Sequence, residues 1–216
     1  MLKILSLLWT GSLFGAGAAF LTQIILARNL GPTAYGAFSA VLAAVNLAAP
    51  LAAFGVGGLW LRVFGKEGWG ALRWIRPSLS FSLISTLVVI IVLLGWGFLG
   101  PHNAGTTKLF TILSFCVVGQ AVVEIHSARF QLEEKYTRLA MWQFAPHALR
   151  LASVGVLAVH FGSGLSGSAV AIAYAVVAAV VVALGAVPLS RMIRGEVALK
   201  GHDERPKAHA PAEPTR

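Results

Sequence analysis

Residues 78–99, SLSFSLISTLVVIIVLLGWGFL, contain no charged side chain. A helix needs about 20 apolar residues to cross a hydrocarbon core about 30 Å thick, so this stretch predicts a transmembrane helix. Five further stretches are long and mainly apolar, and they cover about residues 4–27, 37–61, 109–128, 139–161 and 167–190. The sequence therefore predicts an all-α integral membrane protein with six transmembrane helices in residues 1–194.

The composition agrees with this class and argues against a nucleic-acid-binding protein. Hydrophobic residues make up 57% of the chain and charged residues 12%, whereas ordinary soluble domains carry roughly 25% charged residues. The net charge is +9, but the basic residues lie at the ends of apolar stretches and form no single stripe. That placement is typical of the positive-inside bias of membrane proteins, and we expect no nucleic-acid partner.

The Lys and Arg residues also orient the predicted bundle. If the N-terminus is cytoplasmic, the cytoplasmic segments contain 14 of the 17 Lys and Arg residues: Lys3, Arg62, Lys66, Arg73, Arg76, Arg129, Lys135, Arg138, Arg191, Arg194, Lys200, Arg205, Lys207 and Arg216. The outer loops contain Arg28 and Lys108, and Arg150 lies within a span. The positive-inside rule therefore predicts that both termini are cytoplasmic.

Breaker residues and composition divide the chain further. Gly31-Pro32, Gly100-Pro101 and residues 162–164 predict turns at the outer face, and two longer charged loops are expected inside, at residues 62–77 and 129–138. Residues 195–216 are polar and rich in Pro, Ala, Lys and Glu. Such a segment buries too little apolar area to fold, which predicts a disordered cytoplasmic tail.

Small residues predict where helices pack closely. Gly11 and Gly15 follow the G-x-x-x-G spacing in the first span, and the second span has several alanines around Pro50. Small side chains let helix backbones approach each other in a membrane. This density indicates close packing of the first and second spans, and Pro50 indicates a kink in the second.

Polar side chains within the predicted spans mark a candidate functional site. Gln143, His147 and Arg150 follow i, i+4, i+7 in the fifth span and so share one helix face. The fourth span has a polar face of its own, made of Gln120, Glu124, Ser127 and Gln131. Spans four and five form a hairpin, so the two faces could meet.

Two interpretations of these faces are open. In the structural one, Arg150 or His147 neutralises Glu124 and fastens the hairpin. In the functional one, the polar residues form the cationic wall of a water-filled pathway, because ionisable groups within a membrane usually face a cavity or a partner. Arg28 and Arg62, at span ends, are similarly either interfacial anchors or contacts for an anionic head group.

The chain shows no signature of an enzyme, a metal site or a cofactor site. Cys116 is the single cysteine and Asp203 the single aspartate, so neither a cysteine-based metal site nor a pair of catalytic aspartates can be built. Glu133 and Glu134 lie among basic residues and are better explained as a solvated loop. We expect no catalytic residue, no metal and no cofactor.

Residues 27–39, ARNLGPTAYGAFS, resemble the first hairpin of the polysaccharide transporters. These form the O-antigen flippase-like branch of the multidrug/oligosaccharidyl-lipid/polysaccharide exporter superfamily. The segments 20–23, 54–57 and 131–150 are also similar, and the resemblance extends over about residues 5–190. It implies a multi-pass protein of the bacterial inner membrane that translocates undecaprenyl-diphosphate-linked oligosaccharide in lipopolysaccharide or other polysaccharide biosynthesis.

The resemblance also suggests partners and site residues. A lipid-linked oligosaccharide and membrane lipids are the expected partners, and Arg28, Arg62 and Arg150 are candidates for binding the diphosphate, because Arg forks match phosphate oxygens. Gln120, Glu124, Gln143 and His147 would form the surrounding polar network. No residue is expected to be catalytic.

The chain departs from this family in size, since the family has about twelve or more spans. Six spans correspond to the N-terminal lobe alone. The chain is then a truncated or split product, a lobe that pairs with a second lobe or a second copy, or a relative that has lost transport. A membrane scaffold of a polysaccharide assembly complex and a small-molecule exporter of the same superfamily are the alternative functions.

Overall fold

The computed structural model describes residues 2–194, and this part of the chain is helical throughout apart from short connections. The predicted tail, residues 195–216, lies outside the described residues. The helices follow in the order α1 (Leu2–Ala53), α2 (Val56–Glu67), the 3-10 helix η1 (Gly68–Trp74), α3 (Ile75–Leu99), α4 (Ala104–Leu113), α5 (Cys116–Leu132), α6 (Tyr136–Phe161), the short 3-10 helix η2 (Gly162–Gly164) and α7 (Gly167–Ile193).

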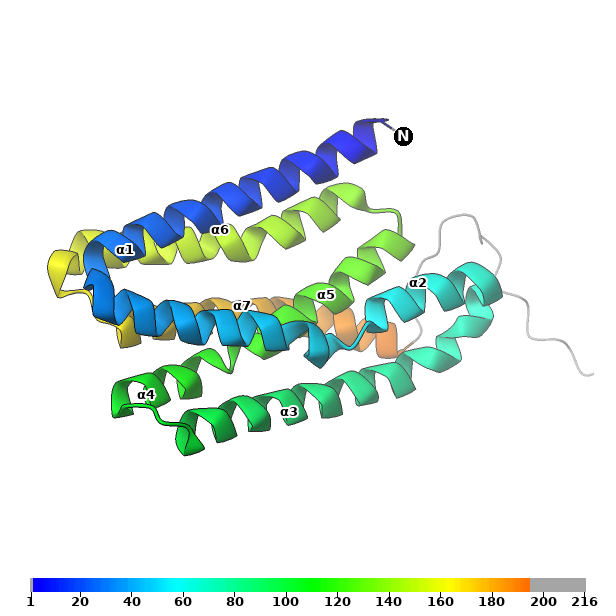
Figure 1. Cartoon of the computed structure of the whole chain (residues 1–216). Coiled ribbons are helices and arrows are strands. Elements are labelled where there is room, and N and C mark those ends of the chain that lie inside the picture. Colours follow the sequence, from blue (N-terminus) through cyan, green and yellow to red (C-terminus); the bar gives the residue numbers. More distant parts are fainter. Residues whose placement is uncertain (1, 195–216) are drawn as a thin grey trace, which may run out of the picture.

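Helix α1 reverses direction at Gly31. This glycine has φ 72° and ψ 165°, a backbone conformation that only glycine adopts readily. Pro32 follows at the start of the second arm, where a missing backbone N–H is tolerated. Figure 1 shows both arms extending from this point towards the same end of the bundle, so that the chain direction of the second arm is opposite to that of the first. The turn predicted at Gly31-Pro32 is therefore confirmed.

The structure is that of a multi-pass membrane protein. Within residues 2–194, five helical stretches are long and apolar enough to cross a membrane: Trp9–Glu67, Gly70–Leu99, Ala104–Leu132, Tyr136–Phe161 and Gly167–Arg191. The first of them contains the reversal at Gly31. Large apolar side chains such as Leu47, Leu99 and Val159 are 79–90% exposed, as expected for surfaces that face lipid.

Two predicted spans are interrupted. The span expected at residues 37–61 is divided, because Phe54 (φ 43°) and Gly55 (φ 69°) have left-handed backbones between α1 and α2. The span expected at residues 109–128 is broken at Ser114 and Phe115, between α4 and α5. The Ser114 hydroxyl donates to the Phe110 carbonyl at 2.6 Å, a bond that often bends a helix.

The segment 62–77, predicted as a charged loop, is helical. It contains the end of α2, all of η1 and the start of α3. Its apolar face is buried, since Phe64 and Ile75 pack in one cluster with the preceding Trp60 and with Ile125 and Ala128 of α5. The Trp60 indole also donates to the Ser78 hydroxyl at 2.7 Å. Apolar burial therefore outweighs the exposed charges of this segment.

The small residues of the first arm pack against α6. A Cβ placed on Gly11 would lie 3.2 Å from the Ala140 Cβ, and one on Gly15 would lie 3.4 Å from the His147 ring. The prediction that these glycines join the first and second spans is therefore wrong. The G-x-x-x-G spacing indicates a close helix contact, but it does not identify the partner helix.

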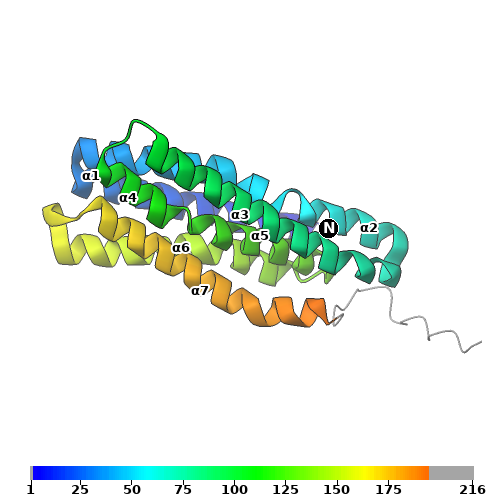
Figure 2. The same cartoon turned by 90° about the horizontal axis from the view of Figure 1, so that it is seen from below.

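The two ends of the bundle differ in charge. One end contains helix α2, η1, the α5–α6 connection and the end of α7 (Figures 1 and 2). The other end contains the Gly31 reversal, the α3–α4 connection and η2. The basic residues in the segments of the first end are Arg62, Lys66, Arg73, Arg76, Arg129, Lys135, Arg138, Arg191 and Arg194. Near the other end are Arg28, just before the reversal, and Lys108 in α4. We call the first the basic end.

Candidate functional site, a polar cavity in the bundle

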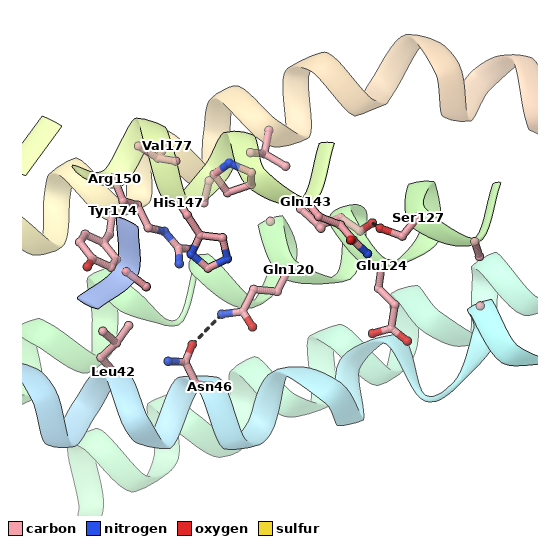
Figure 3. Close-up of a pocket in the computed structure, with 18 of the residues that line it drawn as sticks. Leu42, Asn46, Gln120, Glu124, Ser127, Gln143, His147, Arg150, Tyr174 and Val177 are labelled. Atoms are coloured by element: carbon pink, nitrogen blue, oxygen red, sulfur yellow. Dashed lines mark hydrogen bonds between the residues drawn. The ribbon is translucent and has the colours of Figure 1, made fainter. Parts of the chain in front are cut away.

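A cavity of about 640 Å³ lies between both arms of α1 and helices α2, α5, α6 and α7. Ligand sites in proteins typically have volumes of about 300–1,000 Å³. Its polar or ionisable lining residues are Thr22, Gln23, Asn46, Gln120, Glu124, Ser127, Gln131, Gln143, His147, Arg150 and Tyr174. Many polar groups therefore line one space, as the labelled side chains in Figure 3 show, whereas many large apolar side chains are exposed on the outside of the bundle.

Helical spacing brings the polar side chains of α5 and α6 to this cavity. On α5 they recur at i, i+4, i+7 and i+11, from Gln120 to Gln131, and on α6 at i, i+4 and i+7, from Gln143 to Arg150. Such positions lie one above another on a helix face. The structure thus brings together Gln120, Glu124, Gln143, His147 and Arg150, which the sequence had singled out on two separate faces.

Arg150 presents a charge to the cavity that no carboxylate balances. Its guanidinium carbon lies 5.0 Å from the centroid of the Tyr174 ring, in a cation–π contact. Within residues 2–194 it forms no ion pair, and its buried Nε has no hydrogen-bond partner. A half-buried cation without a counter-charge is costly, so this arrangement favours the binding of an anion.

Glu124 lies apart from Arg150. In the described part of the chain, Glu124 belongs to none of the ion pairs. Figure 3 shows its carboxylate on the opposite side of Gln120 from the Arg150 guanidinium. The interpretation in which Arg150 or His147 neutralises Glu124 is therefore wrong, and the cavity contains two separated, opposite charges.

A pair of carboxamides also lines this cavity. The Gln120 Nε2 donates to the Asn46 Oδ1 at 3.0 Å, which links α5 to the second arm of α1. Figure 3 shows this bond below the His147 and Arg150 side chains, with Glu124 to one side, further along α5. The bond uses one donor and one acceptor, and the remaining amide groups face the open space.

Two of the candidate arginines lie elsewhere. Arg28 and Arg62 are both exposed and are not among the residues that line this cavity. The structure therefore separates them from Arg150. Conversely, the sequence reasoning missed Asn46 and Tyr174. Asn46 could have been found as a lone amide in an apolar stretch, because polar groups in membrane helices usually contact protein, whereas Tyr174 gives no comparable signal.

The described residues provide no metal centre. Within residues 2–194, no three His, Cys, Asp or Glu side chains are grouped so that they could hold a metal ion. Cys116 is fully buried in the main apolar core. The cavity lining offers hydrogen-bonding groups and charged side chains.

Fold and cavity define an α-helical, multi-pass membrane protein with an internal polar site. A family model described as "Polysaccharide biosynthesis protein" matches residues 1–204. The chain belongs to this family, and so it is a membrane protein of polysaccharide biosynthesis. Neither a curated protein nor a solved structure matches the chain.

Proposed function

We propose that this protein carries undecaprenyl-diphosphate-linked oligosaccharide across the bacterial inner membrane, as the N-terminal lobe of a flippase. The observation that supports this most is the unpaired Arg150 guanidinium in the polar cavity. A diphosphate has the charge that this site lacks, and an Arg fork binds phosphate oxygens in a bidentate manner. Membership of the polysaccharide biosynthesis family agrees with such a substrate.

The proposal includes six membrane crossings with both termini in the cytoplasm. The second arm of α1, residues 32–53, is about 33 Å long at 1.5 Å per residue, which suffices for one crossing. The first arm provides another, and α3, α4 with α5, α6 and α7 provide the other four. The concentration of Lys and Arg at the basic end favours a cytoplasmic location for that end.

In this mechanism no covalent bond of the substrate is made or broken, so the protein is not an enzyme. Arg150 binds the diphosphate near the middle of the bundle, and Gln143 and His147, on the same face of α6, lie beside the path from the basic end. Exposed polar groups such as Asn46 need a protein or water surface opposite them in a membrane. We therefore include a second lobe, either another chain or a second copy, in the working transporter.

The test compares Arg150→Gln, Arg150→Lys and the control Lys108→Gln in cells that depend on this protein for surface polysaccharide. Lys108 is exposed on α4 and does not line the cavity. We expect Arg150→Gln to abolish surface polysaccharide and to accumulate the lipid-linked intermediate, Arg150→Lys to retain part of the activity, and Lys108→Gln to behave as wild type. Membrane insertion is verified for each variant.

Other outcomes identify the rival functions. If the protein is a scaffold, surface polysaccharide is normal in the Arg150→Gln variant but absent when the protein is deleted. If the protein is a small-molecule exporter, surface polysaccharide is normal both in the variant and when the protein is deleted. Either result contradicts the proposed flippase.

A further inference from the structure

We propose that the amide-lined half of the cavity is a sugar subsite, which binds the saccharide next to the diphosphate and disfavours acidic sugars. This inference rests on the proposed function, because it deepens the role of the same cavity. It concerns the residues between Arg150 and the basic end, above all Asn46, Gln120 and Glu124.

The two ends of the cavity differ chemically. One end has the Arg150 guanidinium against the Tyr174 ring, while the other has Glu124 with Ser127 and Gln131, further along α5 towards the basic end. The step from Gln120 to Gln131 along α5 is about 16 Å at 1.5 Å per residue. A ligand with an anionic group at Arg150 therefore has a polar surface beside it, on α5, that extends towards the basic end.

The middle of this surface suits hydroxyl or acetamido groups. A carboxamide carries two N–H donors and one oxygen acceptor with two lone pairs. Because the Gln120 Nε2 donates to the Asn46 Oδ1, the Asn46 Nδ2 and the Gln120 Oε1 are left to donate and to accept, respectively. Their mutual bond fixes both side chains before a ligand arrives, which reduces the entropy lost on binding. Gln143 on α6 adds a further amide to the same cavity (Figure 3).

The charge at the far end selects among sugars. Glu124 is half-buried and, within the described residues, has no basic partner. A carboxylate of the ligand close to it would meet a like charge in a region that is poorly screened. Specificity often comes from such a repulsive element as much as from attraction. The arrangement favours neutral or amino sugars over uronic acids.

The experiment measures binding of three soluble probes to the purified full chain in lipid nanodiscs: farnesyl diphosphate, farnesyl diphosphate linked to N-acetylglucosamine, and farnesyl diphosphate linked to glucuronic acid. We expect N-acetylglucosamine to increase the affinity at least tenfold over farnesyl diphosphate alone, and glucuronic acid to increase it less than threefold. Arg150→Gln should weaken all three probes.

Amide variants isolate the sugar subsite. Asn46→Leu and Gln120→Leu should each reduce the gain from N-acetylglucosamine to less than threefold, and leave the affinity for farnesyl diphosphate unchanged. The matched control is Asn29→Leu, because the Asn29 amide donates to the Ile25 carbonyl of its own helix and lies outside the cavity. That control should retain the full gain. Glu124→Gln should reduce the discrimination against glucuronic acid.

The outcomes separate this inference from the proposed function. If farnesyl diphosphate binds through Arg150 but the sugar adds no affinity in the wild type, the sugar subsite is wrong and the diphosphate site stands. A gain that survives in both amide variants also overturns the subsite. If the gain depends on Asn46 and Gln120 while Arg150→Gln changes nothing, the subsite is supported and the diphosphate contact is wrong. Failure of all three probes to bind overturns both.

Discussion

Two charged regions of the molecule, the α5–α6 connection and the cavity, differ in whether their carboxylates form ion pairs. At the α5–α6 connection, the expectation that Glu133 is solvated is wrong, because its side chain is only 2% exposed. It binds two cations, since the Arg129 Nε and the Lys135 Nζ each donate to it at 2.7 Å. Arg129 also donates to the Pro188 carbonyl of α7 at 3.1 Å. In the cavity, Arg150 and Glu124 share no ion pair.

The comparison teaches which charges stabilise the fold and which are available to a ligand. Around Glu133 the carboxylate has two cationic partners within the chain, and the network ties α5 to the end of α7. In the cavity the charges are separated and unbalanced, which costs folding free energy and is retained where it serves binding. The same residue types therefore have different roles, according to whether a partner within the fold balances their charge.

Glu133→Gln should have the largest effect on stability. It leaves the largely buried Arg129 and the partly exposed Lys135 without their counter-charge, which we expect to cost about 3 kcal/mol of the free energy of unfolding. The measurement is reversible denaturant unfolding of the purified protein in micelles. Glu67→Gln is the control, because the Glu67–Arg73 pair is exposed and should contribute less than about 1 kcal/mol. Equal effects of the two changes would remove the contrast between the regions.

Arg150→Gln should have the largest effect on binding and a small effect on folding. Loss of charge-assisted hydrogen bonds of about 2 kcal/mol lowers the affinity for farnesyl diphosphate by about 30-fold. The free energy of unfolding should stay the same or rise, because a half-buried cation without a counter-charge is removed. A large loss of stability in the same unfolding assay contradicts the assignment of Arg150 to the ligand.

Glu124→Gln makes the comparison sharper, because it is the same chemical change as Glu133→Gln, about nine positions earlier on the polypeptide. We expect the free energy of unfolding to change by less than about 0.5 kcal/mol, since Glu124 has no ion pair within the described residues. A destabilisation as large as that of Glu133→Gln shows instead that Glu124 is part of a structural network.

Arg28→Gln and Arg62→Gln should have the smallest effects. Both side chains are exposed and do not line the cavity, so we expect the affinity for farnesyl diphosphate to change less than threefold at moderate salt, where distant charges are screened. The same binding assay checks this. If either change reduces the affinity as much as Arg150→Gln does, the anion does not bind in the cavity and the assignment is wrong.

Much of the helical arrangement could be predicted from the sequence, because long apolar stretches and turn residues such as Gly31 have direct physical consequences. The interruptions at Phe54 and at Ser114 could not, since they depend on local backbone geometry within apolar sequence. The G-x-x-x-G pair indicated a close contact, but its partner, α6, depends on the tertiary arrangement.

The candidate site was predictable in part. Helical spacing was enough to find the polar faces of α5 and α6, because residues at i, i+4 and i+7 share a face. The sequence could not decide whether Arg150 pairs with Glu124, since that depends on how far apart the two side chains lie across the hairpin. It also gave no reason to join Asn46, which is 74 positions away in the chain, to Gln120.

The most direct test of the cavity as the substrate site is photo-crosslinking in cells that produce the lipid-linked oligosaccharide. A benzophenone amino acid replaces either Gln143, which lines the cavity, or Met141, which is 67% exposed on the same helix and does not line it. We predict capture of the lipid-linked oligosaccharide at Gln143 and not at Met141, and loss of capture when Arg150→Gln is added. Equal capture at both positions, no capture at Gln143, or capture that is indifferent to Arg150 would contradict the account.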